Sequence, residues 1–181
     1  MDNQVIDIYG LVKPLVDVHT LGLSTVANLL RDCHCKVCIA SDDINEAIQH
    51  IHKINNYGLL KQWIVMNGIT KLGFSYRLDP QEGCDYFMSL YHHLVDDKMF
   101  VTAGGPLKQV FFAGLPDTCQ LVSAKTNNQV LVFPGDESPI ETLKKLDIPD
   151  VLLPESLHQN NEYDDMRWKF ATELIASEKY K

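Results

Sequence analysis

Hydrophobic residues along this chain fall into two alternating kinds of segment. Short, nearly continuous apolar runs, typical of buried strands, occupy residues 5–12, 36–40, 69–75, 99–103 and 110–113, with a candidate edge strand at 130–133. Segments in which apolar residues recur every three or four positions, the spacing of an amphipathic helix, lie between them at residues 23–32, 44–51, 60–67, 80–94 and from 116 onward. This alternation predicts an α/β fold, a doubly wound parallel five-stranded sheet of the flavodoxin-like or Rossmann-like kind.

Two helix ends are marked by residues with a specific capping role. The run Asp79-Pro80-Gln81-Glu82 combines a cap, a proline of the first turn and an acid three residues after the cap, which together begin a helix. Asn67-Gly68 suits the end of a helix, where glycine adopts the left-handed conformation at low cost. The loops that follow the strands therefore have defined lengths, and ligands of such folds bind at the carboxyl ends of the strands.

The pattern changes after Gly135. A short helix is expected over residues 136–146, the stretch 158–165 is polar and acidic, and apolar positions in 168–175 suggest a last helix. We therefore expect one ligand-binding domain over residues 1–135 and a helical extension over 136–181. The extension would link the domain to a further domain or to a partner subunit.

Composition narrows the class of protein. The formal net charge is −8 and no cluster of Lys and Arg occurs, which argues against a nucleic-acid-binding protein. No apolar run approaches the length of a membrane span, and the first residues lack the pattern of a signal peptide. The five cysteines are an odd, unevenly spaced set, which fits free thiols in a reducing cytoplasm. We expect a cytoplasmic protein that binds neither nucleic acid nor a membrane.

The loop after the first predicted strand carries the most informative residues. It reads Asp17-Val-His19-Thr-Leu-Gly22 and leads into an amphipathic helix. A neutral imidazole is a good ligand for a transition metal, and a carboxylate that bonds its second nitrogen fixes the tautomer and raises its basicity. Gly22 would let a bulky ligand lie against the backbone where the helix begins. This loop therefore suits a protein that offers His19 to a large metal cofactor.

Three blocks together resemble the cobalamin (vitamin B12)-binding domains of methionine synthase, B12-dependent mutases and corrinoid proteins. The first is Asp17 to Gly22, which matches their Asp-x-His-x-x-Gly signature. The second is Leu72 to Leu78, where the family carries a Ser-x-Leu element, and the third is Val101 to Gly105, where it carries a Gly-Gly pair. The order and spacing match over about residues 4–135.

The resemblance implies a role for each block. His19 would displace the cofactor's own benzimidazole and become the lower ligand of cobalt, and Asp17 would bond the other ring nitrogen. Ser75 would lie beside the displaced nucleotide tail, and Gly104 and Gly105 would line the slot that the tail enters. The cofactor would be methylcobalamin or adenosylcobalamin. The partner would be the catalytic domain or subunit of a B12-dependent methyltransferase or mutase, an isomerase.

The predicted order of strands and helices also brings the three blocks together, without reference to the cobalamin-binding family. Asp17 and His19, Ser75, and the Gly104–Gly105 pair each follow a predicted strand, so we expect them to converge on one edge of the sheet. One departure is that the second block reads Ser-Tyr-Arg-Leu, so that Arg77 stands where the family has leucine. Its charge could serve a phosphate or an amide side chain of the cofactor, or an acid on a partner domain.

The segment Cys33-His34-Cys35-Lys36-Val37-Cys38 also contains metal-binding residue types. Its spacing is not that of a zinc ribbon, which needs two separated pairs, nor that of a radical S-adenosylmethionine motif. We expect core thiols there.

Other ligand-binding motifs are absent from the sequence. A phosphate-binding P-loop, a dinucleotide-binding Gly-x-Gly-x-x-Gly, a flavodoxin phosphate loop, the acids of a response regulator and a serine hydrolase elbow are all missing. Two classes of function remain. The chain is either a cobalamin-binding module whose chemistry is completed on another domain, or a flavodoxin-like interaction or regulatory domain without the corrinoid.

Overall fold

The computed structural model describes residues 7–53, 55–155 and 157, and it confirms the predicted α/β fold. Five strands form one sheet in the order β2-β1-β3-β4-β5, and every neighbouring pair is parallel. The strands are β1 (Ile8–Val12), β2 (Lys36–Ile39), β3 (Lys71–Tyr76), β4 (Gln109–Gly114) and β5 (Leu131–Phe133). The predicted edge strand near residue 130 is therefore the fifth strand of the sheet.

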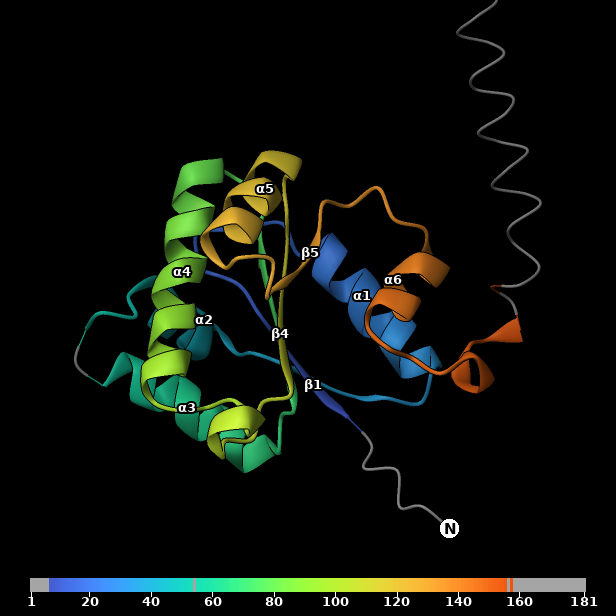
Figure 1. The fold of residues 1–181 in the computed structure, drawn as a ribbon, viewed down its shortest axis with the longest axis horizontal. Coiled ribbons are helices and arrows are strands. Elements are labelled where there is room, and N and C mark those ends of the chain that lie inside the picture. Colours follow the sequence, from blue (N-terminus) through green and yellow to red (C-terminus); the bar gives the residue numbers. More distant parts are fainter. Residues whose placement is uncertain (1–6, 54, 156, 158–181) are drawn as a thin grey trace, which may run out of the picture.

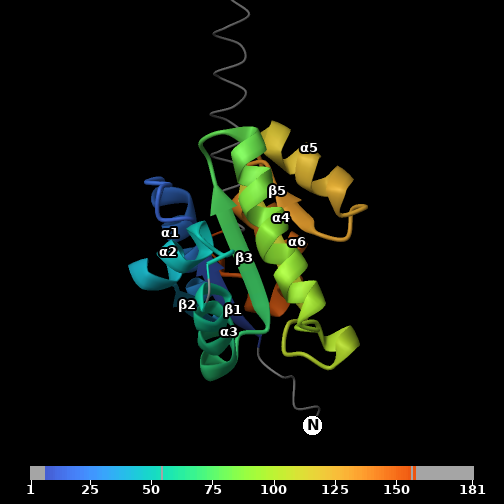
Figure 2. The ribbon, with the colours of Figure 1, turned by 90° about the vertical axis from the view of Figure 1, so that its left-hand side faces the viewer.

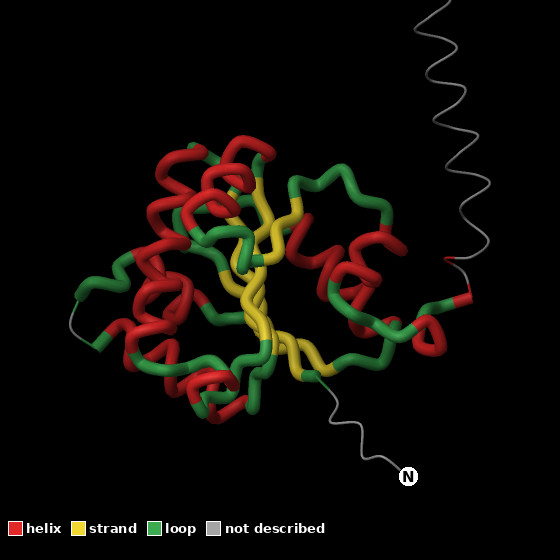
Figure 3. The backbone as a smooth tube through the Cα atoms, viewed as in Figure 1, coloured by secondary structure: helices red, strands yellow, loops and turns green. Residues whose placement is uncertain are grey.

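Helices cover both faces of the sheet (Figures 1 and 3). The α-helices are α1 (Leu21–Asp32), α2 (Asp42–Gln49), α3 (Asn56–Asn67), α4 (Pro80–Asp96), α5 (Pro116–Lys125) and α6 (Pro139–Lys145), and two short 3-10 helices are η1 (Val101–Ala103) and η2 (Asp150–Leu152). Helices α2 to α5 pack on one face, which is turned toward the viewer in Figure 2, and α1 and α6 pack on the other. The molecule is thus a three-layer sandwich.

Each face of the sheet has its own hydrophobic core. On the face of α2 to α5, the rings of Phe74, Phe87 and Phe112 meet with centroids 5.3–5.9 Å apart. On the opposite face, the ring of Phe111 meets that of Phe133 edge to face at 5.7 Å. Phe111 and Phe112 point to opposite faces because successive side chains of a strand alternate. An unbroken apolar run such as that of β4 is therefore expected where both faces are covered.

Capping residues set the helix boundaries as predicted. The Asp79 carboxylate accepts a hydrogen bond from the backbone N–H of Glu82 at 2.8 Å, and Pro80 opens α4. Gly68 follows α3 with φ of 65°, in the left-handed region that glycine tolerates. These ends fix the lengths of the loops that surround the strands.

The strand predicted at residues 99–103 is wrong. Apart from a single bridge between Phe100 and Leu107, this segment is not paired with a strand, and its last three residues form η1. A tight loop explains the difference: Lys98 and Gly104 have φ of 55° and 92°, so the chain turns back on itself before β4 begins. The apolar run at 109–114 takes the central place beside β3 instead.

The first part of the predicted extension packs on the sheet. The short helix expected after Gly135 is α6, and Leu143, Leu146 and Leu153 join the core beneath α1. The helix expected over 168–175 lies outside the described residues, so a link to a further domain or partner stays a prediction. Within the described part of the chain, no helix is both long and apolar enough to cross a membrane.

Candidate functional site

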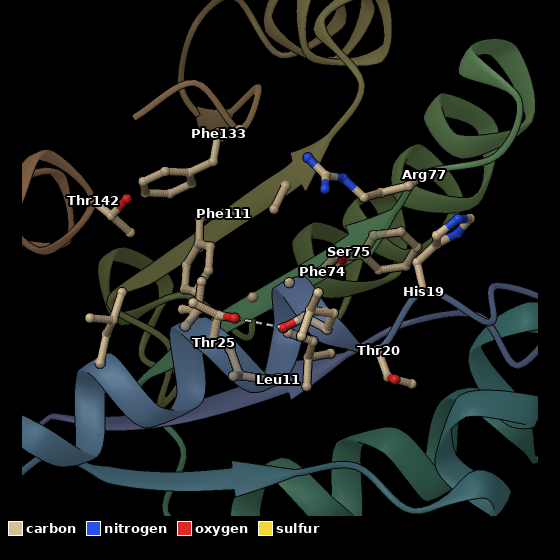
Figure 4. Close-up of a pocket in the computed structure, with 18 of the residues that line it drawn as sticks. Leu11, His19, Thr20, Thr25, Phe74, Ser75, Arg77, Phe111, Phe133 and Thr142 are labelled. Atoms are coloured by element: carbon tan, nitrogen blue, oxygen red, sulfur yellow. Dashed lines mark hydrogen bonds between the residues drawn. The ribbon is translucent and has the colours of Figure 1, made fainter. Parts of the chain in front are cut away.

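A cavity of about 630 Å³ opens at the carboxyl edge of the sheet, on the face covered by α1 and α6. Its floor is formed by β1, β3 and β4, and its sides by α1, α6 and the loop after β5 (Figure 4). The strand order reverses between β1 and β3, because the chain passes from β1 to β2 on one side and β3 lies on the other. Such a switch point is where α/β folds bind ligands.

The inner walls of the cavity are mainly apolar. The lining includes the side chains of Leu11, Leu29, Phe111, Phe133 and Leu146. Gly73 in the floor allows the Phe111 ring to lie close to β3, since a Cβ at this glycine would stand 2.3 Å from a ring carbon. Apolar walls with a few polar groups are typical of small-molecule and cofactor sites.

Asp17 and His19 form a hydrogen-bonded pair in the loop between β1 and α1. The Asp17 side chain is completely buried, and its Oδ1 lies 2.8 Å from His19 Nδ1 and accepts the His19 backbone N–H at 2.9 Å. A carboxylate oxygen can only accept, so Nδ1 donates to Asp17, and Nε2 is the ring nitrogen that the carboxylate leaves free. The imidazole lines the cavity with its side chain 51% exposed, and no described residue hydrogen-bonds Nε2.

Asp17 also joins two loops across the switch point. Its Oδ2 accepts the backbone N–H of Arg77, which follows β3, at 2.8 Å. The loop before Asp17 is held to α2, because the Lys13 N–H donates to Asn45 at 3.2 Å and the Val16 N–H donates to Gln49 at 2.8 Å. The position of the His19 ring is thus set by a network of hydrogen bonds around the buried Asp17 carboxylate.

Gly22 and Ser75 lie where the sequence predicted, on the same edge as His19, and both line the cavity. Gly22 occupies the first turn of α1, and the nearest atom to a Cβ added there is an Arg77 nitrogen at 4.0 Å. A side chain at position 22 would therefore point into open space that a ligand can use. Ser75 stands near the end of β3 and is half-buried.

The structure does not bring Gly104 and Gly105 to this site, which corrects the predicted convergence. They follow η1 and precede β4, so they lie at the opposite, amino edge of the parallel sheet, and neither lines the cavity. Gly105 has a local role, since a Cβ there would stand 2.2 Å from the carbonyl carbon and oxygen of Met99. The pair shapes the loop before β4.

Arg77 and Gly135 complete the mouth of the cavity. Gly135 has φ of 93°, and a Cβ there would stand 2.4 Å from Arg77 Nη2, so glycine makes room for the guanidinium. Glu137 also lines the cavity, but it is bound to Lys145 at 2.6 Å and accepts the N–H of Gly135 at 3.0 Å. Gly135 and the wall formed by α6 were not among the predicted site residues. The available signal was a Pro-Gly pair directly after the apolar run at 130–133.

The cysteine-rich segment places one buried thiol, Cys33, and two half-buried thiols, Cys35 and Cys38, around the start of the edge strand β2. Burial raises the pKa of the Cys33 thiol to about 11, and burial also raises the pKa of Cys35, so neither is a ready thiolate ligand. No group of three or more His, Cys, Asp or Glu side chains that could hold a metal ion occurs in the part of the chain that the structure describes.

Comparison with known protein families finds no family model that matches this chain. No curated protein matches it either.

Proposed function

We propose that this chain binds cobalamin with the cofactor's own base displaced and His19 as the lower ligand of cobalt. The observation that carries the proposal is the Asp17–His19 pair at the mouth of a cavity of about 630 Å³. The buried Asp17 carboxylate orients the imidazole and leaves Nε2 as the nitrogen that can coordinate a metal. This is the arrangement found for metal-ligating histidines. A corrin ring supplies the equatorial nitrogens itself, so the protein needs to add a single ligand.

The cavity suits the displaced nucleotide tail. Its volume falls in the range of roughly 300–1,000 Å³ that is usual for organic ligands. It begins beside His19 and runs between α1 and α6 along the sheet, so the tail would enter next to the imidazole that replaces its base. This assignment replaces Gly104 and Gly105 with Gly22, Ser75 and the walls of α1 and α6.

The bound corrinoid would supply methyl transfer or cobalt–carbon homolysis, and the chain would present it to a separate catalytic domain or subunit. The chain would contribute the His19 imidazole, the Asp17 carboxylate that tunes its basicity, and control of access to the cofactor. All five cysteines are free in the structure, which supports a location in the reducing cytoplasm.

Electron paramagnetic resonance of the cobalt(II) form tests the proposal. Protein labelled with ¹⁵N-histidine is mixed with cobalamin and reduced; an imidazole ligand splits each cobalt line into a doublet, whereas the cofactor's own ¹⁴N base gives a triplet. We expect doublets from the wild-type protein and from the His92→Gln control on the exposed surface of α4. His19→Gln should lose the doublets. Triplets from the labelled wild-type protein would overturn the proposal.

The second candidate is an interaction or regulatory domain that binds no corrinoid. Exposed apolar side chains beside the cavity favour it, above all Val18 and Leu21, which are 77% and 80% exposed. Such residues also suit the docking of a catalytic partner onto the loaded edge. A protein that stays colourless and takes up no cobalamin would favour this second function over the first.

A further inference from the structure

We infer that Arg77 binds the phosphate of a nucleotide-like ligand whose flat, apolar base fills the cavity. The inference rests on the proposed function, because it assigns the contacts of the cofactor's tail. Beyond the proposed function, Arg77 is assigned to the phosphate, and the apolar walls of the cavity are assigned to the base.

The first observation is the position of the Arg77 guanidinium. The side chain extends from the end of β3 over the end of the neighbouring strand and lines the cavity (Figure 4). Gly22 and Gly135 stand on either side, where a Cβ would lie 4.0 Å from Nη1 and 2.4 Å from Nη2 respectively. The backbone N–H of Arg77 is held by Asp17, so the root of the side chain is fixed.

The second observation is that Arg77 lacks a counter-charge in the described residues. No described carboxylate lies within 4.0 Å of its guanidinium. Glu137, which also lines the cavity, pairs with Lys145 through one oxygen and accepts the N–H of Gly135 with the other. A guanidinium presents several donors in a planar fork that matches phosphate oxygens, so an anion is the ligand group that this position selects.

The third observation concerns the inner part of the cavity. Two of the three threonines that line the cavity already use their hydroxyl protons, Thr25 as a donor to the carbonyl of Leu21 at 2.9 Å and Thr142 as a donor to that of Ser138 at 3.0 Å. A base with exocyclic carbonyl oxygens would find neither hydroxyl free to donate to it, and burying an unpaired oxygen is costly. Dimethylbenzimidazole has no such groups, and in cobalamin the phosphate precedes the ribose and base along the tail. The charged phosphate would therefore lie at the mouth beside Arg77, and the apolar base would lie among the apolar side chains of the inner walls.

Calorimetric titration with fragments of the tail tests the inference. The probes are α-ribazole 3′-phosphate, α-ribazole without phosphate, and inorganic phosphate alone. We expect Arg77→Gln to weaken the phosphorylated fragment about 10- to 100-fold, the usual range for a charge-assisted hydrogen-bonded contact, and to change the affinity for α-ribazole less than about twofold. Arg31→Gln, which removes an exposed charge elsewhere on α1, should change neither.

Comparison of the wild-type affinities needs no variant. Wild-type protein should prefer the phosphorylated fragment to α-ribazole by the same factor, and should bind inorganic phosphate far more weakly than either. Equal affinities for the two fragments, equal losses of both in Arg77→Gln, or tight binding of inorganic phosphate alone would overturn the inference. Doublets in the resonance spectrum with no such phosphate preference would overturn this inference alone. A phosphate preference in a protein without imidazole ligation would leave it standing and overturn the proposed function.

Discussion

At the scale of single residues, Asp17 carries the most interactions of the site. Its two oxygens accept the backbone N–H groups of His19 and Arg77 and hold the imidazole, and the side chain is shielded from water. Replacing a buried carboxylate that accepts this many hydrogen bonds should lower the free energy of unfolding. Each N–H donor left without an acceptor stays removed from water with no hydrogen bond in return.

We predict that Asp17→Asn lowers the free energy of unfolding by about 1–3 kcal/mol and weakens cobalamin binding. The amide keeps the size of the side chain but replaces one acceptor with a donor that faces an N–H or Nδ1. Urea unfolding and absorbance titration measure the two effects. Asp85→Asn, a change at an exposed ion pair with Lys125, should alter the unfolding free energy by less than about 1 kcal/mol. Equal stability of the two variants would contradict the structural role of Asp17.

At the scale of elements, the fold followed from the sequence more fully than the site did. Periodicity located the helices, and alternation of strands and helices predicted the parallel sheet. The strand expected at 99–103 failed because apolar residues that fill a loop, such as buried Met99 and Leu107, look in sequence like those of a strand. The backbone turns at Lys98 and Gly104 that decide between the two depend on packing around the loop.

The candidate site divides in the same way. Asp17, His19, Gly22 and Ser75 were placed correctly because they lie at or just after the carboxyl ends of true strands. The glycine pair was misplaced because the segment before it, predicted as a strand, is a loop. The walls from α1 and α6 were not predictable as a cavity, because the space between two helices depends on how they pack and not on a local pattern.

Replacing two glycines by alanine should change the free energy of unfolding in opposite directions. Gly105→Ala should lower the unfolding free energy by about 1–3 kcal/mol, because the new Cβ would collide with the backbone of Met99 and the loop would have to move. Gly58→Ala, within α3 and with nothing inside 4 Å of the new Cβ, should raise it by about 0.5–1 kcal/mol. Thermal or urea unfolding measures both. A destabilised Gly105→Ala that still binds cobalamin would agree with its distance from the site.

At the scale of the whole molecule, Asp7 and two lysines tie three strands together at the amino edge. Asp7 precedes β1 and bonds Lys108, just before β4, at 2.6 Å and lies 3.6 Å from Lys71 of β3. Lys71 is itself buried and donates to the carbonyl of Leu146, at the end of α6, at 2.7 Å. The same cluster therefore holds α6 over the cavity at the other end of the sheet.

This cluster predicts a dependence of stability on acid. Burial opposes the charge of Asp7, but hydrogen bonds from Lys108 and Thr70 and the field of Lys71 outweigh it and lower the pKa below its ordinary value of 3.8. The stabilisation is present above 3.8 and is lost as the pH falls through the lower pKa of the folded state. We expect the melting temperature of Asp7→Asn to decline less than that of the wild type below about pH 4. Parallel curves for the two proteins would contradict this role.

The two faces of the sheet differ in how completely protein atoms fill them. The face under α2 to α5 is packed by its own side chains, whereas the face under α1 and α6 contains a space of about 630 Å³. A ligand in that space would add contacts that only the folded protein can make. Ligand binding and folding would therefore be linked, and the melting temperature would rise with ligand concentration. The protein without a ligand and the protein with one would then unfold at different rates, so occupancy of the cavity would set how long the folded chain persists.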